Sequence, residues 1–320
     1  MANSKRQTKR VTRAERRAAE EAAQKALAEQ AAKERKQQTI IGIIVVAIVV
    51  ALVAVIGVVV WRNVTKSSDT SSANADAAYS TLQSVKTKPA KADDKAGFLI
   101  SKDGYGKKTA NVPTVGIYME PLCPGCASVN RQLDPTLVKM MNAGQLNLDL
   151  HFLNFQDNKS SDNYSNRAFN GAIYIAEHDD DPNHLMNYLS NIYAEDFQPG
   201  ELTNYVPVKN SKLQAQAEKA GVSKEVAKAA FSGKNEYVEW LSASNDYTIA
   251  RPELFSSSGS FSSPTLTINN TYWPLSNISL ANTTMVDGFL KAVGLKSDQV
   301  GVAGKLPSIG ASKKPIDITA

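Results

Sequence analysis

The chain has 320 residues, which would allow about two average domains, but both of its ends are unlike folded core. We therefore expect one globular domain of about 200 residues. The formal net charge of +5 arises entirely in residues 1–38, where eleven Lys and Arg stand against five Glu. A surplus confined to one short arm argues against a nucleic-acid-binding surface, so no nucleic-acid partner is expected. The sequence also contains no phosphate loop, hydrolase triad or nucleotide fingerprint.

Residues 1–38 form the basic arm, and a charge-free apolar run of about 22 residues follows within 39–61. At a rise of about 1.5 Å per residue, a helix of this length spans the roughly 30 Å hydrocarbon layer of a bilayer. We predict a single transmembrane helix at 39–61 with the arm in the cytoplasm, because basic flanks remain on the cytoplasmic side. The rest of the chain is then extracytoplasmic, at the cell membrane.

A cleaved signal peptide is the alternative for the same segment. However, the apolar run is longer than a usual h-region, the basic region before it is far too long, and no good small-x-small cleavage site follows. An uncleaved signal anchor is therefore favoured. Residues 62–96 are rich in Ser, Thr, Ala, Lys and Asp and predict a flexible extracytoplasmic linker. Residues 299–320 are predicted to be a disordered tail.

The globular domain is expected over residues 97–298. Thr114–Glu120 has the β-branched and aromatic content of a short strand, and Leu146–Phe155 is a second strand with alternating sides. An amphipathic helix lies between them, and Pro135 is expected to kink or break it.

The second half of the domain begins with a helical pattern. From about 160 to 250 the apolar residues recur at three and four positions, which predicts about four helices. Strand character returns at Thr265–Asn269 and Tyr272–Leu275, and a last helix is predicted at about 282–293. The expected order is β-α-β, helical block, β-β-α, which is an α/β fold.

The only two cysteines stand in one tetrapeptide, Cys123-Pro124-Gly125-Cys126. A disulfide between these two cysteines would stabilise the fold only weakly. In the chain-entropy model, a disulfide that closes a four-residue loop stabilises the folded state by about 1.9 kcal/mol, against roughly 3 kcal/mol for a fifteen-residue loop. At a helix start the two positions share one face, and the free amides with the helix dipole stabilise a thiolate on Cys123. We predict that Cys123 is an exposed nucleophile and that Cys126, one turn further, is its less exposed resolving thiol. Pro124 fits the first helical turn, and Gly125 adds no charge.

The two cysteines have two alternative uses. A zinc site needs about four ligands, and the chain adds only His151, His178 and His184, none of them in a paired arrangement with a cysteine. No metal is therefore expected. A purely structural disulfide is the remaining alternative. Thiol–disulfide exchange is favoured, and the redox-active Cys123–Cys126 disulfide then takes the place of a cofactor.

Ser263-Pro264 precedes a predicted strand, and from these residues alone the proline could simply begin that strand. The run from Ile117 to Phe155, with CPGC in it, resembles the DsbA-like branch of the thioredoxin superfamily. The resemblance rests on an acidic residue three before the first cysteine, the CPxC motif, and a proline and a glycine further on. In this sequence these are Glu120, Cys123–Cys126, Pro135 and Gly144.

The resemblance covers about residues 96–295 and implies a thioredoxin-like fold with a helical insertion at about 160–250. It also implies that Pro264 is a cis-proline facing the cysteines and that Ser263 touches the sulfurs and binds substrate. The family often has a buried acid six residues before the first cysteine, whereas this chain has Ile117. Glu120 could partly replace that acid or lie at the surface. The usual residue before the cis-proline is Thr or Val, not Ser.

We therefore expect a membrane-tethered thiol–disulfide oxidoreductase that exchanges disulfides with exported cysteine-containing proteins, in the first instance as an oxidant. By the same resemblance a membrane redox partner would recycle the CPGC pair. The alternatives are a disulfide reductase and a non-catalytic thioredoxin-like module that binds a peptide or an envelope partner. Loss of the proton-shuttling acid is the feature that favours the last of these.

Overall fold

The computed structural model of the chain describes residues 68–320. The predicted cytoplasmic arm (1–38), the transmembrane helix (39–61) and the start of the predicted linker lie outside these residues. Among the helices at 68–320, none is both long and apolar enough to cross a membrane.

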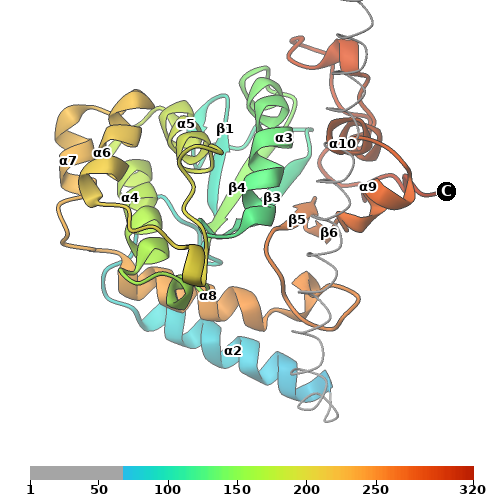
Figure 1. Cartoon of the computed structure of the whole chain (residues 1–320). Helices are drawn as coiled ribbons and strands as arrows, with labels where there is room; N and C mark the ends of the chain where they lie inside the picture. The colour runs from blue at the N-terminus through green and yellow to red at the C-terminus, as the bar shows by residue number, and fades with distance from the viewer. Residues whose placement is uncertain (1–67) are drawn as a thin grey trace, which may run out of the picture. The chain divides into compact units, whose positions relative to one another are not determined.

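A six-stranded sheet forms the centre of the domain, in the order β2-β1-β4-β3-β5-β6 (Figure 1). β3 and β4 are parallel, with Ile117 opposite Leu150, and all the other pairs are antiparallel. The strands are β1 (Phe98–Ser101), β2 (Gly104–Tyr105), β3 (Thr114–Met119), β4 (Asn147–Phe152), β5 (Thr265–Ile268) and β6 (Thr271–Tyr272). Strands were therefore correctly predicted at β3, β4, β5 and β6, although β6 is shorter than expected, and β1 and β2 were missed.

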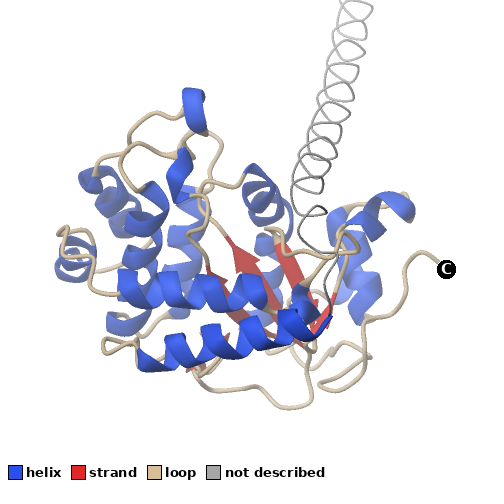
Figure 2. Cartoon of the chain, turned by 90° about the horizontal axis from the view of Figure 1, so that it is seen from below, coloured by secondary structure: helices blue, strands red, loops and turns tan. Residues whose placement is uncertain are grey.

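Helices surround the sheet (Figure 2). The helices between β4 and β5 in the sequence form the predicted insertion. The helices are α2 (Ser68–Ser84), α3 (Pro124–Asn142), α4 (Tyr164–His178), α5 (Pro182–Ile192), α6 (Asn210–Lys219), α7 (Lys224–Ala230), α8 (Val238–Ala250), α9 (Ser276–Leu280) and α10 (Met285–Val293). The insertion thus contains five α-helices instead of about four. The α/β class and the order β-α-β, helical block, β-β-α are confirmed. α3 continues unbroken past Pro135, so the predicted break at that residue is wrong.

One face of the sheet packs on α3 and carries the main core, because alternate side chains of a strand point to opposite faces. Ile117 and Leu150 face this core together with Leu133 and Leu137 of α3. The opposite face is more polar, with Asp149 and the stacked rings of Tyr118 and His151. This alternation places the Cys-bearing end of α3 against the apolar face.

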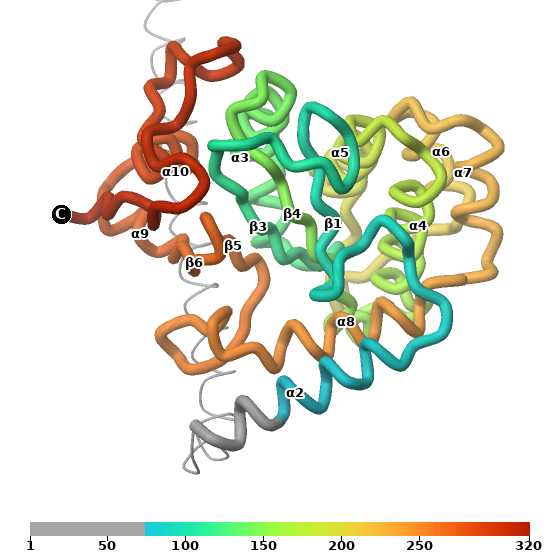
Figure 3. Tube along the Cα trace, turned by 180° about the vertical axis from the view of Figure 1, so that it is seen from behind, coloured from blue at the N-terminus to red at the C-terminus, as the bar shows by residue number. Residues whose placement is uncertain are grey.

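Helix α2 occupies part of the segment predicted to be a flexible linker (62–96), so that prediction is wrong from Ser68 onward. α2 lies alongside α8 (Figure 3), with the rings of Tyr79 and Tyr247 5.3 Å apart and Leu82 buried. The segment is rich in Ser, Thr, Ala and Asp, yet a narrow stripe of apolar residues one turn apart is enough to bind it to a neighbouring helix.

The predicted disordered tail (299–320) is also wrong, because the structure fixes these residues to the domain. The fully buried side chain of Gln145 donates to the backbone carbonyls of Gln299, Val302 and Lys305 and accepts from the Gly301 amide. Further along, Ile309 is buried. The polar composition concealed this contact, which consists mainly of backbone hydrogen bonds to one side-chain amide.

Asp134 on α3 is a buried carboxyl group without a charged partner. Its Oδ2 accepts from Asn130 at 2.5 Å, and Oδ1 has no hydrogen-bond partner in the described part of the chain. Burial raises the pKa of Asp134 to about 7.

Asp134→Asn is expected to stabilise the protein more at pH 8 than at pH 5. The pKa of Asp134 is higher in the folded than in the unfolded state. The free energy of unfolding of the wild type therefore falls as the pH rises from the ordinary aspartate range to about 7. The variant does not lose this stability, because an asparagine side chain does not ionise. Denaturant unfolding at the two pH values should show the gain growing by about 2 kcal/mol. The exposed Asp298→Asn is the control and should show no such growth; an equal gain at both pH values would contradict the account.

Candidate active site

Cys123 is the N-cap residue of α3, directly after the turn that follows β3. Its backbone is extended (φ −68°, ψ 117°), and its Sγ accepts a hydrogen bond from the Cys126 amide at 3.4 Å. Pro124 fills the first helical position, where a backbone donor is not needed. The free amides and the positive end of the helix dipole therefore meet at Cys123 Sγ, as the sequence predicted.

The two thiols differ strongly in acidity. A hydrogen bond with the Cys126 thiol lowers the pKa of Cys123 to about 7 against the opposing effect of burial, with further help from the Ser263 side chain and the helix amides. Burial, followed by the interaction with Cys123, raises the pKa of Cys126 well above its ordinary value. Both cysteines are free thiols in this structure. The pair is thus arranged with the thiolate on Cys123.

The prediction that Cys123 is exposed is wrong, since its exposed fraction is 5%, close to the 3% of Cys126. The cause is the segment before β5, which lies over the pair. The Ser263-Pro264 peptide bond is cis, and the Cys123 thiol donates to the Ser263 carbonyl at 3.4 Å. A Cβ at Gly125 would lie 2.9 Å from Pro264 Cδ, so the missing side chain permits this close approach. Residues 140 positions apart in sequence form one site.

Glu120 is fully buried. The sequence allowed either a buried position, where this residue partly replaces the missing acid, or a surface position, and the structure shows the buried one. Its backbone N–H points to Cys126 Sγ at 3.4 Å. One carboxylate oxygen accepts from the Leu122 amide at 2.7 Å, and the other accepts from the Ser165 hydroxyl. Burial raises the pKa of Glu120 well above its ordinary value; the Ser165 hydrogen bond opposes the shift and the Cys123 charge adds to it. Ile117 is an apolar core residue.

Three residues of the site come from the helical insertion and were not found from the sequence. The Tyr193 hydroxyl donates to the Glu120 carbonyl at 3.0 Å. The Gln198 amide donates to the carbonyls of Pro121 and Cys123 at 3.0 and 3.2 Å. Ser165 at the start of α4 holds the Glu120 carboxyl group. These contacts join segments more than 40 residues apart and mostly involve backbone carbonyls, so no local pattern signals them.

Comparison with known proteins agrees with this architecture. The family described as thioredoxin matches residues 102–271, more than half of the chain. The chain belongs to the thioredoxin family. Within this thioredoxin-family protein, the CPGC at the start of α3, the cis-proline before β5 and the inserted helices α4–α8 confirm the DsbA-like form that the sequence resembles.

Individual relatives are more distant from this thioredoxin-family protein. The reduced structure of DsbA from Mycobacterium tuberculosis is 22% identical with a TM-score of 0.44, covering 58% of this chain and 89% of that one. MdbA, a thiol-disulfide oxidoreductase from Actinomyces oris, is 16% identical with a TM-score of 0.45, covering 62% of this chain and 89% of that one. The serine/threonine-protein kinase PknE of Mycobacterium tuberculosis is 35% identical over 104 residues, 32% of this chain. The match covers 18% of that kinase's length.

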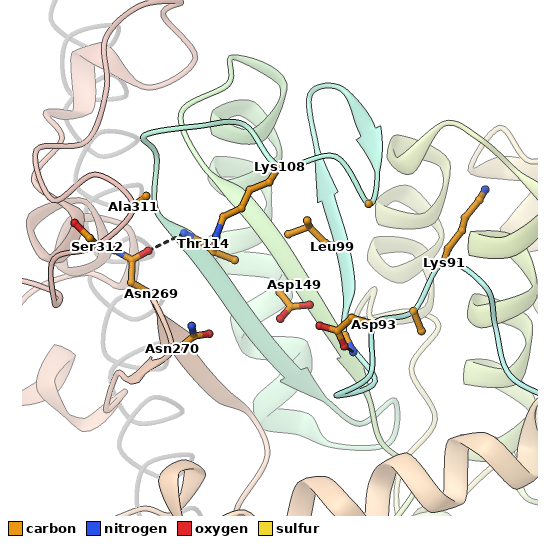
Figure 4. A pocket seen from close by; sticks show the side chains of 13 residues that line it. Lys91, Asp93, Leu99, Lys108, Thr114, Asp149, Asn269, Asn270, Ala311 and Ser312 are labelled. Carbon is orange, nitrogen blue, oxygen red and sulfur yellow. Dashed lines mark hydrogen bonds between the residues drawn. The ribbon is translucent and has the colours of Figure 1, made fainter. Parts of the chain in front are cut away.

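The sheet of this thioredoxin-family protein borders a cavity of about 470 Å³ that lies away from the cysteines (Figure 4). It lies on the polar face of the sheet and is lined by Asp93, Lys108, Thr114 and Asp149, among others. No predicted site residue lines it. The Nε2 atom of nearby His151 is 3.1 Å from Asp149 Oδ2. Among the described residues no group of three or more His, Cys, Asp or Glu could hold a metal ion.

Proposed function

We propose that this chain is a protein thiol–disulfide oxidoreductase that introduces disulfides into exported cysteine-containing proteins through Cys123 and Cys126. The observation that carries the proposal is the opposite displacement of the two thiol pKa values at the start of α3. A structural pair gains nothing from this difference, whereas exchange chemistry depends on it. The match of the thioredoxin family to residues 102–271, which include both cysteines, supports the same reaction class.

Disulfide transfer would proceed in two steps. A substrate thiolate attacks Cys123 Sγ of the oxidised pair, which forms a mixed disulfide and breaks the Cys123–Cys126 bond, and Cys126 leaves as a thiolate that takes up a proton. A second substrate thiolate then attacks the substrate sulfur of the mixed disulfide, and Cys123 leaves. The substrate loses two electrons and the enzyme pair gains them. The low pKa of Cys123 makes it the better leaving group, and the high pKa of Cys126 keeps it from reversing the first step.

Glu120 is proposed as the proton source for Cys126. Its raised pKa keeps the carboxyl protonated where an ordinary glutamate is ionised, and its ionised form raises the pKa of Cys126, so the two groups are electrostatically coupled. Ser165 and Leu122 hold the carboxyl in place. Ser263 is proposed to pair its backbone with the substrate chain beside the reacting sulfurs.

The cellular setting follows from the sequence. With a signal anchor at 39–61 and the N-terminus in the cytoplasm, the described domain would work outside the membrane, on exported proteins. A membrane redox partner would reoxidise the Cys123–Cys126 pair after each cycle.

The test is oxidation of a reduced peptide containing two cysteines by the oxidised full chain, followed by mass spectrometry of the peptide. We expect stoichiometric transfer of one disulfide and accumulation of the enzyme dithiol. Cys123→Ser should lower the rate by more than about 100-fold, because a serine hydroxyl cannot replace the thiolate in exchange. A wild-type chain that leaves the peptide reduced would instead indicate a non-catalytic binding module.

A further inference from the structure

In addition to Leu122 and Ser165, the Glu120 carboxyl group contacts the side chain of Gln156. The Gln156 amide nitrogen lies 3.3 Å from Glu120 Oε2 and 3.0 Å from Glu201 Oε1. Both neighbours are carboxylate oxygens, which accept hydrogen bonds, so the amide places its N–H groups between them. One half-buried side chain thus joins a fully buried carboxyl group to a second carboxyl group that is 21% exposed.

Glu201 fixes the Gln156 side chain from the surface of the domain. Its Oε1 accepts from Gln156, and its Oε2 pairs with Lys159 Nζ at 2.9 Å. Gln156 and Lys159 both lie between β4 and α4, so Glu201 binds this turn through both of its oxygens. The Gln156 side chain makes no hydrogen bond that caps the 3₁₀-helix following it. Its amide N–H groups therefore serve the two glutamates.

The same turn also reaches the other oxygen of Glu120. Asp157 Oδ1 accepts from the Ser165 amide at 2.8 Å, and the Ser165 hydroxyl donates to Glu120 Oε1. Asp157 directly follows Gln156 in the chain. A single turn therefore holds Oε1 of Glu120 through Ser165 and Oε2 through Gln156, and it fixes the orientation of the buried carboxyl group.

Gln156 and Glu201 act on the protonation of Glu120 in opposite directions. A hydrogen-bond donor favours the ionised form of a carboxyl group, and a nearby negative charge favours the acid form. Burial raises the pKa values of both neighbouring tyrosines, so their side chains are neutral where the thiols titrate. Among the residues that the structure describes, the titratable groups near Glu120 are Cys123 and Cys126 of α3, Tyr164 of α4, Tyr193 after α5, and Glu201 with its partner Lys159.

We propose that Gln156 is a positioning residue of the exchange reaction. It holds the Glu120 carboxyl group and stabilises the carboxylate that remains once Glu120 has given its proton to Cys126. The proton passes from the carboxyl group to the Cys126 thiolate, and the Gln156 N–H then donates to the carboxylate left behind. The inference deepens the proposed function and rests on it, because Glu120 donates this proton only if Cys126 leaves as a thiolate.

Gln156→Met tests this role, because methionine is of similar length but has no N–H to donate. Loss of the donor should raise the pKa of Glu120 by about one unit. Glu201→Gln should lower the pKa of Glu120 by about half a unit, because a negative charge is removed while the new side-chain oxygen can still accept from Gln156. Gln214→Met is the matched control, since Gln214 is also half-buried and donates to a glutamate, Glu218, at 2.8 Å. It should leave the pKa of Glu120 unchanged.

The pKa of Glu120 is measured by carbon-13 NMR on the full chain with labelled glutamate carboxyl groups, and the signal is assigned by its loss in Glu120→Gln. Both cysteines are changed to serine, so no thiol titrates and the measurement does not depend on disulfide exchange. Opposite shifts in Gln156→Met and Glu201→Gln are expected. No shift in Gln156→Met, or shifts of the same sign in both variants, would overturn the inference. If Gln156→Met fails to fold, an unchanged pKa of Glu120 in Glu201→Gln overturns it alone.

In the oxidised chain that keeps its cysteines, the same variants should displace the pH dependence of the exchange rate. After division by the thiolate fraction of the attacking peptide, the fall in rate should move to higher pH in Gln156→Met and to lower pH in Glu201→Gln. A rate lowered equally at every pH would show a purely structural role for Gln156 and contradict the inference. Opposite NMR shifts without any disulfide transfer would refute the proposed function and leave the contact of Gln156 with Glu120 in place.

Discussion

Cys126→Ala is expected to turn the protein into a trap for its substrates. In the reduced variant the Cys123 thiolate attacks a peptide disulfide, forms a mixed disulfide and releases one peptide thiol. The resolving thiol is absent, so the product should persist for hours instead of breaking down within minutes. This variant loses the hydrogen bond with the Cys126 thiol, which is the largest cause of the low pKa of Cys123, but the α3 amides and Ser263 still favour the thiolate. The expected effect is large because no resolving thiol remains.

Mass spectrometry after incubation with a disulfide-containing peptide measures this outcome. Peptide should be found on Cys123 in nearly every molecule of the variant and in few molecules of the wild type. Cys123→Ala, which leaves the high-pKa Cys126, is the matched control and should trap at least about tenfold less. Equal trapping by the two variants would contradict the assignment of Cys123 as the nucleophilic thiol and Cys126 as the resolving thiol.

Glu120→Gln is expected to slow the reaction of the oxidised chain with a thiol peptide by about tenfold or more near neutral pH. The glutamine fills the same space and can still accept from Leu122 or Ser165, but it cannot donate a proton to the departing Cys126 thiolate. Because the pKa of Glu120 is raised, its acid form persists to higher pH than that of an ordinary glutamate and is lost as pH increases through that raised value.

The measurement is the rate as a function of pH, divided by the thiolate fraction of the attacking peptide. For wild type this corrected rate should fall as pH rises through the pKa of Glu120, and for Glu120→Gln it should be flat. Glu120→Asp should restore part of the dependence. The exposed Glu225→Gln on α7 controls for loss of a distant charge. A variant that merely unfolds more easily and keeps the wild-type pH profile would leave Glu120 with a structural role alone.

Local sequence signals were sufficient for the centre of the fold. A short β-branched strand, a CPGC tetrapeptide and an amphipathic helix are contiguous, and each restricts the backbone on its own. The resemblance to DsbA-like proteins added the cis bond before Pro264, which no local pattern specifies. Glu120 was identified by position, but its burial depends on Ser165 and Tyr193 of the insertion, and these contacts cannot be derived from spacing.

The two incorrect predictions of unstructured segments share one physical cause. Residues 68–84 and 299–320 are polar in composition, and polar composition was interpreted as absence of structure. In the first segment, Tyr79 and Leu82 suffice to bind a helix to α8. In the second segment, the buried Gln145 side chain donates to three backbone carbonyls. The segment therefore binds to the domain through its main chain, and amino-acid composition gives no information about main-chain contacts.

The reduction potential of the Cys123–Cys126 pair tests the central claim most directly. The full chain is equilibrated with graded glutathione and dithiothreitol buffers, and the fraction of disulfide is measured by thiol alkylation and mass spectrometry. A redox-active pair predicts a single two-electron transition between roughly −270 and −120 mV, the range spanned by thioredoxin and DsbA. A potential below about −300 mV, typical of structural disulfides, or failure to form the disulfide would contradict the account.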